Sequence, residues 1–287
     1  MKNFKTQFNN MMTHSGFKIC FFAVLLIAFA NTFLLLLHSY GGYRGYLIDI
    51  SDASLLNFYS PLVNIFHIIS LCLLILPHGL SNTRKNDLYG KLNQDNVVSF
   101  KDYCLSGMLV SFLGTFAAFF IPLVISLFVN GFFFEPTGIL GSGFSIYEFN
   151  GAADIAGTNC NDTILNPGYC VIPIKLYMRN PQLYNVLYAL MYSLVMGILA
   201  SHVFQMSFYF KRNIYVIVYV YMLYYIILWL QGGLGRYYES RYELDFFSYI
   251  TVSYNMNLHP YYLIGFVLVI LIASIPLYRH KKLEVLG

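Results

Sequence analysis

Six long apolar runs that contain no charged side chain constrain this chain more than any other feature of its sequence. They cover residues 19–38, 58–76, 104–129, 183–208, 214–230 and 261–278. A helix needs about 20 mostly apolar residues to cross a bilayer, and each run is close to that length. A charge at the bilayer centre costs about 2.5–3.5 kcal/mol, so runs free of Asp, Glu, Lys and Arg predict six transmembrane helices.

The overall charge content supports the same fold class. Only 10% of the 287 residues are charged and 58% are hydrophobic, whereas soluble domains carry about 25% charged residues. So few charges cannot cover the surface of a water-soluble protein of this length. We therefore expect an all-α integral membrane protein, and not a soluble enzyme, a disordered chain or a nucleic-acid-binding module.

The charges between the runs predict the orientation of the chain. If the N-terminus is cytoplasmic, the inner segments hold twelve of the 17 Lys and Arg residues and four of the 13 acidic residues. The inner face then carries +8 and the outer face −4, which together give the formal +4. Because cytoplasmic loops are enriched in Lys and Arg, we expect both termini in the cytoplasm and the chain in the plasma membrane.

The first 18 residues have the spacing of an amphipathic helix. Their apolar side chains share one helical face, which holds Phe4, Phe8, Met11 and Met12. We predict a helix over 1–18 that lies in the cytoplasmic interface, with a frayed tail as the alternative. A secretory signal cleaved after Ala30 competes for the first run, but that run continues to Leu37, which favours an uncleaved anchor. Residues 19–287 are then one six-span domain.

Residues 77–103 are the largest predicted cytoplasmic segment. Ser81 is a suitable N-cap for a short amphipathic helix, which would carry Arg84, Lys85, Leu88 and Tyr89. Its size and amphipathic content predict a docking site for another protein, whereas an ordinary positive-inside loop is the alternative reading of its charge.

Two predicted outer segments stand out. Residues 130–182 are rich in Gly, Pro and Asn, and they contain Cys160 and Cys170 ten positions apart. On an oxidising face such a pair is expected to form a disulfide, with two free thiols as the alternative. Residues 231–260 include an apolar aromatic stretch from Phe246 to Tyr254. This stretch fits either a short element that re-enters the membrane or a surface loop with an aromatic belt.

Polar residues within the runs are candidates for function. Asn64 with His67, and His202 with Gln205, form pairs at one-turn spacing. Intramembrane polar groups often mark functional sites, and two histidines on different helices can ligate a metal or haem. A neutral histidine bonded to a neighbouring helix is the commoner case, so we expect no metal site and no cofactor in this chain.

The fourth and fifth runs carry two further patterns. Small residues recur every fourth position in the fourth run, at Ala189, Ser193, Gly197 and Ser201. This spacing predicts close helix packing, within the subunit or across a dimer. The fifth run is rich in tyrosines, whose hydroxyls need partners. We predict that Tyr221, Tyr224 and Tyr225 line a path for an amphipathic substrate together with Asn64 and His67, with simple packing as the alternative.

Motifs for enzyme chemistry are absent from the sequence. It has no HExxH, GxSxG, CxxC or GxxxxGK[ST] pattern, so we do not expect an enzyme. Ion-coupled transporters and proton pumps usually need a charged intramembrane residue, and these runs have none. If transport here is driven by ATP, the hydrolysing subunit must be another chain.

The predicted architecture resembles the membrane (permease) subunit of a type-2 ABC transporter. The shared features are six spans with both ends inside, an N-terminal interfacial helix, a large loop after the second span, a short one after the fourth and a hydrophobic outer segment before the sixth. Locally, Thr83-Arg84-Lys85, Leu88-Tyr89 and 99–103 (SFKDY) are similar to the Arg and Lys-x-Tyr pattern of that family's coupling element. Residues 77–81 (PHGLS) replace the acidic and Gly-Thr pattern often found before it. The long Cys-bearing outer loop is also unusual and suggests a subfamily for peptide or bacteriocin export or immunity.

This resemblance implies partners and a coupling mechanism. Two membrane subunits, identical or different, would work with cytoplasmic ATPase subunits that bind ATP and Mg, and residues 81–92 would receive the push of ATPase closure. Two other functions stay open at this point. One is a stand-alone immunity factor or receptor that binds a ligand through its outer loop, and the other is a membrane enzyme with a metal on its histidines.

Overall fold

The computed structural model describes residues 2–40, 53–57, 60–79, 100–134, 176, 180–210, 212–237, 246–252, 261 and 263–270. Their helices are α1 (Lys2–Thr13), α2 (Ser15–Tyr40), α3 (Val63–Leu73), α5 (Phe100–Phe133), α9 (Pro181–Met206), α10 (Asn213–Tyr237) and α11 (Phe246–Ile250). Residues 263–270 are also helical, and no strand occurs within these ranges. The described part of the chain is therefore all-helical, as its sequence predicts.

Within the described ranges, three helices are long and apolar enough to cross a membrane. They are Ser15–Leu37 in α2, Asp102–Phe133 in α5 and Gln182–Met206 in α9, and they coincide with the first, third and fourth apolar runs. Val63–Leu73 and Asn213–Ile226 are shorter apolar helical segments. The prediction of an all-helical protein with membrane-crossing helices is confirmed to this extent, whereas the count of six spans and their orientation stay predictions.

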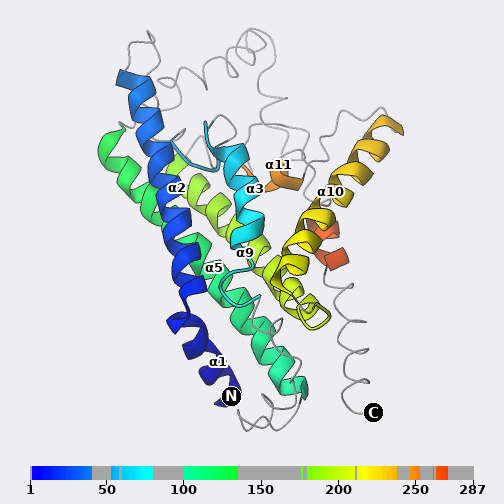
Figure 1. Cartoon of the computed structure of the whole chain (residues 1–287). Coiled ribbons are helices and arrows are strands. Elements are labelled where there is room, and N and C mark those ends of the chain that lie inside the picture. The colour runs from blue at the N-terminus through cyan, green and yellow to red at the C-terminus, as the bar shows by residue number, and fades with distance from the viewer. Residues whose placement is uncertain are drawn as a thin grey trace.

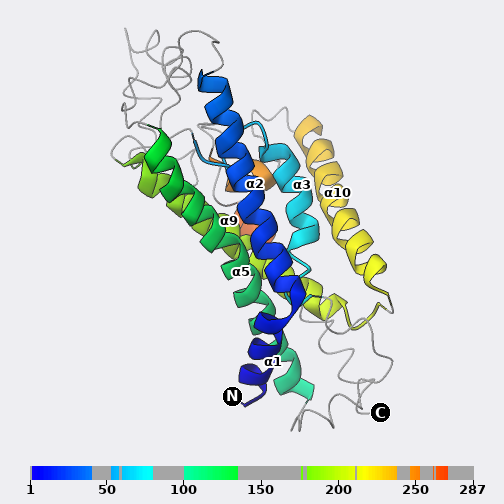
Figure 2. The same cartoon turned by 60° about the vertical axis from the view of Figure 1, so that its left-hand side comes forward.

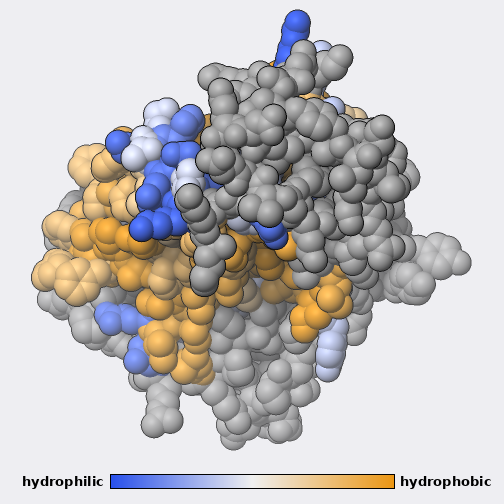
Figure 3. All heavy atoms as spheres, turned by 90° about the horizontal axis from the view of Figure 1, so that it is seen from below, coloured by the Kyte–Doolittle hydropathy of each residue, from blue (hydrophilic) through white to orange (hydrophobic). Residues whose placement is uncertain are grey.

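The helices form a tilted bundle (Figure 1). α5 packs most extensively against α9 and α2, and α3 lies between α2 and α10 in both views (Figures 1 and 2). α1 continues from one end of α2 alongside the first part of α5. Viewed from the end where α1 lies, apolar residues cover a large part of the surface that is not drawn in grey, beside smaller hydrophilic areas (Figure 3).

The N-terminal amphipathic segment forms two helices and not one. α1 ends at Thr13, and α2 begins at Ser15, where the Gly16 N–H donates to the His14 Nδ1 atom at 3.0 Å. The apolar face of α1 packs partly on α5, since Met11 is buried and its sulfur lies directly against Gly114. α1 is thus held against the bundle.

α9 begins at a clear sequence signal. The Asn180 Oδ1 atom accepts a hydrogen bond from the Leu183 N–H at 3.0 Å, and Pro181 follows directly in the first turn. This is the usual pairing of a capping amide with a proline that needs no N–H partner. α5 in turn continues through Pro122, which membrane helices tolerate because neighbouring groups satisfy the freed carbonyl.

Buried polar side chains hold the non-helical chain that precedes α3. The Asn130 Nδ2 group donates to the Ala53 carbonyl at 2.5 Å, and the Thr32 hydroxyl donates to Asn130 Oδ1 at 2.6 Å. The Ser60 hydroxyl donates to Asn31 Oδ1 at 2.6 Å. Non-helical backbone at membrane depth needs partners of this kind, because the acyl chains offer none. These contacts join α2, α5 and the approach to α3, and we call them the polar clamp (Asn31, Thr32, Ser60 and Asn130).

Candidate functional site

His67 lies at the meeting point of four helices. Its side chain on α3 is buried, and its ring stacks on Phe247 of α11 with a centroid distance of 4.2 Å and an interplanar angle of 6°. Tyr192 of α9 lies on the same imidazole at 5.9 Å and 22°. Tyr224 of α10 contacts Phe247 at 5.3 Å. We call these four residues and Tyr221, described below, the His67 junction.

Hydrogen bonds fix the orientation of the junction. The Thr251 hydroxyl donates to the Phe247 carbonyl at 2.6 Å and lies 3.3 Å from His67 Nε2. Since the threonine proton is already donated, we assign the imidazole proton to Nε2, from which it points at the threonine oxygen. The Tyr192 hydroxyl donates to Ser70 Oγ at 2.8 Å. Each polar group named here therefore has a partner, as burial requires.

The predicted path residues divide into two groups. His67, Tyr221 and Tyr224 come together. His67 and Tyr224 both contact the Phe247 ring. The Tyr221 hydroxyl donates to the Ile68 carbonyl of α3 at 2.9 Å and lies 3.1 Å from the Cys72 sulfur. Asn64 and Tyr225 are exposed, with 65% of the Tyr225 surface accessible. The structure therefore assembles part of the predicted path wall at the α3–α10–α11 contact and leaves these two residues outside it.

The aromatic segment of 231–260 enters the bundle. The described residues that follow Phe246 and have described side chains are all buried: Phe247, Tyr249, Ile250, Thr251 and Val252. The Val252 N–H donates to the Leu56 carbonyl at 2.7 Å, next to an isolated parallel bridge between Asn57 and Val252. These described residues therefore pack inside the helical bundle, and re-entry into the membrane stays a prediction.

The second buried histidine has a different set of neighbours. His202 of α9 places its Nε2 atom 2.7 Å from the Tyr219 hydroxyl of α10. Among the residues that the structure describes, no three or more His, Cys, Asp and Glu side chains cluster closely enough to hold a metal. His202 and His67 each have an aromatic neighbour and a hydroxyl partner, the environment of a neutral histidine in a membrane helix.

The small residues of α9 lie against α5. A Cβ atom at Gly197 would come within 2.8 Å of the Phe112 ring, and the Ser201 hydroxyl donates to the Met108 carbonyl at 2.9 Å. Ser193 and Ala189, one and two turns before Gly197, are also buried. In the described chain this face therefore serves packing within the subunit.

Two groups of predicted residues lie outside the described ranges. They are the docking residues Ser81, Arg84, Lys85, Leu88 and Tyr89, and the cysteine pair Cys160 and Cys170. The three cysteines with described positions, Cys20, Cys72 and Cys104, are free thiols.

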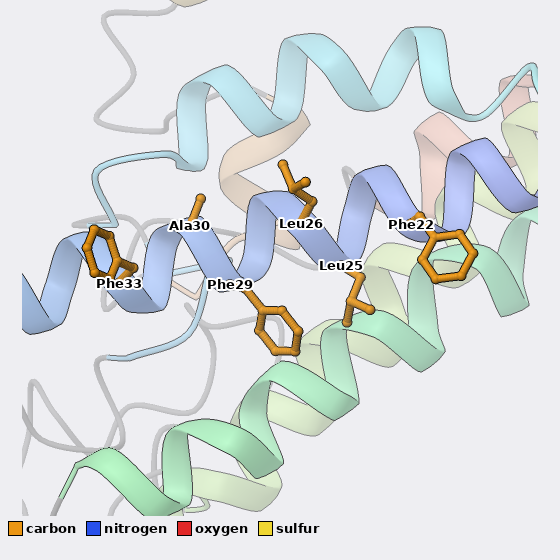
Figure 4. A pocket seen from close by; sticks show the side chains of 6 residues that line it. All are labelled: Phe22, Leu25, Leu26, Phe29, Ala30 and Phe33. Atoms are coloured by element: carbon orange, nitrogen blue, oxygen red, sulfur yellow. The ribbon is translucent and has the colours of Figure 1, made fainter.

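A shallow apolar groove of about 520 Å³ runs along the exposed face of α2. Its lining residues all come from that helix: Phe22, Leu25, Leu26, Phe29, Ala30 and Phe33. Leu25 and Phe29 point toward α5, and no polar side chain joins them (Figure 4). Such a surface suits the acyl chains of lipids and offers no group for catalysis or polar recognition.

Sequence reasoning missed the polar clamp and the role of Tyr192. Asn31 and Thr32 interrupt the first apolar run, and an amide in an apolar run is a signal that was available. Tyr184, Tyr188 and Tyr192 recur every fourth residue and are all fully buried. The spacing of these three tyrosines is visible in the sequence, but the residues of other helices that they contact could not be predicted from it.

The junction is chemically suited to binding. It offers aromatic faces, tyrosine hydroxyls and an imidazole, and none of its members carries a carboxylate, an ammonium or a guanidinium group. Aromatic faces stack on planar or apolar groups, and hydroxyls orient polar ones. None of its members is an activated nucleophile or a general acid–base pair of the usual kind.

The described part of the chain is all-helical, with three helices able to cross a membrane and an aromatic, uncharged junction where α3, α9, α10 and α11 meet. Comparison of the chain with family models, curated proteins and solved structures finds no match.

Proposed function

We propose that this chain is the transmembrane subunit of an ATP-driven ABC exporter that moves an amphipathic substrate, such as a peptide, lipid or drug, by alternating access. In this proposal six spans cross the plasma membrane, and both termini are cytoplasmic. The observation that carries it is the absence of any charged side chain from the six apolar runs, together with the uncharged members of the His67 junction. Without an intramembrane acid or base for ion coupling, the energy must come from another chain.

The proposal assigns ATP and Mg to separate ATPase subunits. These subunits dock on residues 77–103, where Arg84 and Lys85 supply charge and Leu88 and Tyr89 supply apolar contact. A second membrane subunit, identical or different, completes the transporter. A disulfide between Cys160 and Cys170 ties the long outer loop.

The His67 junction forms part of the substrate path. Its members meet where α3, α9, α10 and α11 converge, so helix movements that separate α3 from α10 also separate Tyr221 from its acceptor on Ile68. An aromatic and hydroxyl-bearing wall suits a substrate with apolar and polar parts. This fit supports an amphipathic substrate over an inorganic ion.

A stand-alone immunity factor or receptor is the second candidate. The observation that favours it is the outer segment 130–182, which is longer than a simple connection between two spans needs to be. Such a protein would bind its ligand outside and need no ATPase.

The docking assignment is tested by the double substitution Arg84→Ala with Leu88→Ala. The two residues are one helical turn apart, and their loss should abolish stimulation of ATP hydrolysis while membrane insertion is retained. The matched control is Arg279→Ala with Leu283→Ala, which removes the same two residue types at the same spacing from another predicted cytoplasmic segment. ATPase rates of the purified assemblies in lipid nanodiscs are compared, and wild-type stimulation in R84A/L88A would overturn the assignment.

A further inference from the structure

Both ends of the predicted docking loop rest on the same end of α9. At one end, His78 stacks on Phe204 with a centroid distance of 5.2 Å and an angle of 10°. At the other end, Tyr103 in the first turn of α5 meets Phe208 edge-on at 6.3 Å. Phe204 and Phe208 are themselves in edge contact at 5.4 Å. We call these four residues the aromatic anchor.

Phe204 has little room to move within the anchor. Its side chain is fully buried, and its ring lies so close to Gly107 of α5 that a Cβ atom there would overlap it. The α5 backbone at Gly107 therefore blocks movement of the ring toward α5. Because interiors are closely packed, a push on His78 is passed to Phe204 and α5.

Hydrogen bonds fasten this end of α9 to α5. The Ser111 hydroxyl donates to the Ala200 carbonyl at 3.0 Å, and the Gln205 amide donates to the Met108 sulfur at 2.8 Å. α5 and α9 consequently form a unit that moves together near the anchor. The turn segment that follows α3 meets this unit through the ring stack of His78 on Phe204 and through the hydrogen bond from the Thr115 hydroxyl to the Leu74 carbonyl at 3.2 Å.

The same helix links the anchor to the junction. Tyr192 lies twelve residues before Phe204 on α9, about 18 Å along the helix axis at 1.5 Å per residue. Because Tyr192 stacks on His67, a shift or rotation of α9 at the anchor alters the junction directly. A continuous helix therefore connects the cytoplasmic loop ends with the buried aromatic site.

We propose that the aromatic anchor is the positioning element that transmits movement of the docking loop to α9 and thence to the His67 junction. This inference rests on the proposed function, since it requires that an ATPase moves the loop. It adds that Phe204 and His78 act through ring contact, and that they do not themselves bind the ATPase.

The test compares Phe204→Leu with Phe116→Leu in the transporter complex. Phe116 on α5 is also in ring contact, with Phe112 and Phe120, but it takes no part in the anchor or the junction. In F204L we expect stimulation of ATP hydrolysis to fall at least about fivefold, because coupling between two sites typically changes an equilibrium by about fivefold or more. The amount of ATPase that co-purifies with F204L should be the same as with the wild type. F116L should stay within about twofold of the wild type, below that range.

Substitutions of His78 separate ring contact from a general structural role. His78→Phe preserves an aromatic ring above Phe204 and should retain stimulation, whereas His78→Ala removes the ring and should lose it. Equal loss in H78F and H78A, equal loss in F204L and F116L, or loss of the bound ATPase from F204L would each overturn the inference.

The outcomes also separate this inference from the proposed function. If no ATPase co-purifies with the wild-type chain, the proposed function fails and the inference fails with it. If R84A/L88A loses stimulation and F204L retains it, only the role of the aromatic anchor is wrong.

Discussion

At the scale of single residues, the absence of a side chain sets how closely α5 and α9 approach. Gly197 faces the Phe112 ring, and Gly107 faces the Phe204 ring from the other helix. In a membrane, close packing and hydrogen bonds replace the hydrophobic effect as the force between helices. These two glycines, with the Ser201 and Ser111 hydrogen bonds to opposite backbones, account for the extensive α5–α9 contact.

The substitution Gly197→Ala tests this packing. The added methyl group must displace a buried ring, and overpacking of this kind costs about 1–3 kcal/mol of folding free energy. Gly265→Ala is the control, because a Cβ atom there meets nothing within 4 Å. Alanine should stabilise that helix by up to about 1 kcal/mol. Unfolding in detergent, followed by circular dichroism, should shift in opposite directions, and equal shifts would contradict the packing argument.

Residue types in the path were easier to predict than the directions in which they point. His67, Tyr221 and Tyr224 meet, whereas Asn64 and Tyr225 are exposed. In a soluble helix, alternation of polar and apolar residues shows which face is buried. In a helix that is apolar all round, that signal is missing, so sequence alone could not separate Tyr224 from its neighbour.

At the scale of elements, the apolar runs predicted where helices lie better than where they begin and end. The second run starts at residue 58, but α3 begins at Val63 and ends at Leu73. The fifth run ends at residue 230, but α10 continues to Tyr237. Backbone turns precede α3, since the Ser60 N–H donates to the Asn57 carbonyl at 2.9 Å and the Val63 N–H donates to the Ser60 carbonyl at 3.2 Å. The polar clamp holds this chain through side chains of α2 and α5. Those long-range partners, such as Ala53 with Asn130, could not be paired from the sequence.

The polar clamp is tested by Asn130→Leu. This change removes the donor to the Ala53 carbonyl and the acceptor of the Thr32 hydroxyl, and hydrogen bonds between membrane helices contribute about 0.6–1.7 kcal/mol each. We expect a loss of about 1–2 kcal/mol in unfolding free energy.

Asn64→Leu is the matched control for the clamp, because the same amide is removed from an exposed position on α3. Its stability in the same detergent titration should be unchanged or slightly raised. A larger loss in N64L than in N130L would show that the clamp does not hold the chain before α3.

At the scale of the whole molecule, the distribution of charge and the connection through α9 point to one mode of action. Charges lie between the apolar runs, so the membrane part has no residue suited to ion coupling. α9 carries Phe204 of the aromatic anchor and Tyr192 of the His67 junction, and in our proposal this helix is the mechanical route from an external energy source to the site. We propose that this energy source is a separate ATPase.

The most direct measurement is purification of the tagged full-length chain from its native membrane, followed by mass spectrometry and an ATP hydrolysis assay with Mg. We expect a stoichiometric ATP-binding partner and ATP hydrolysis that depends on this partner. A pure single-component preparation without ATPase activity, from membranes in which the chain is folded, would contradict the account and favour a stand-alone immunity factor or receptor.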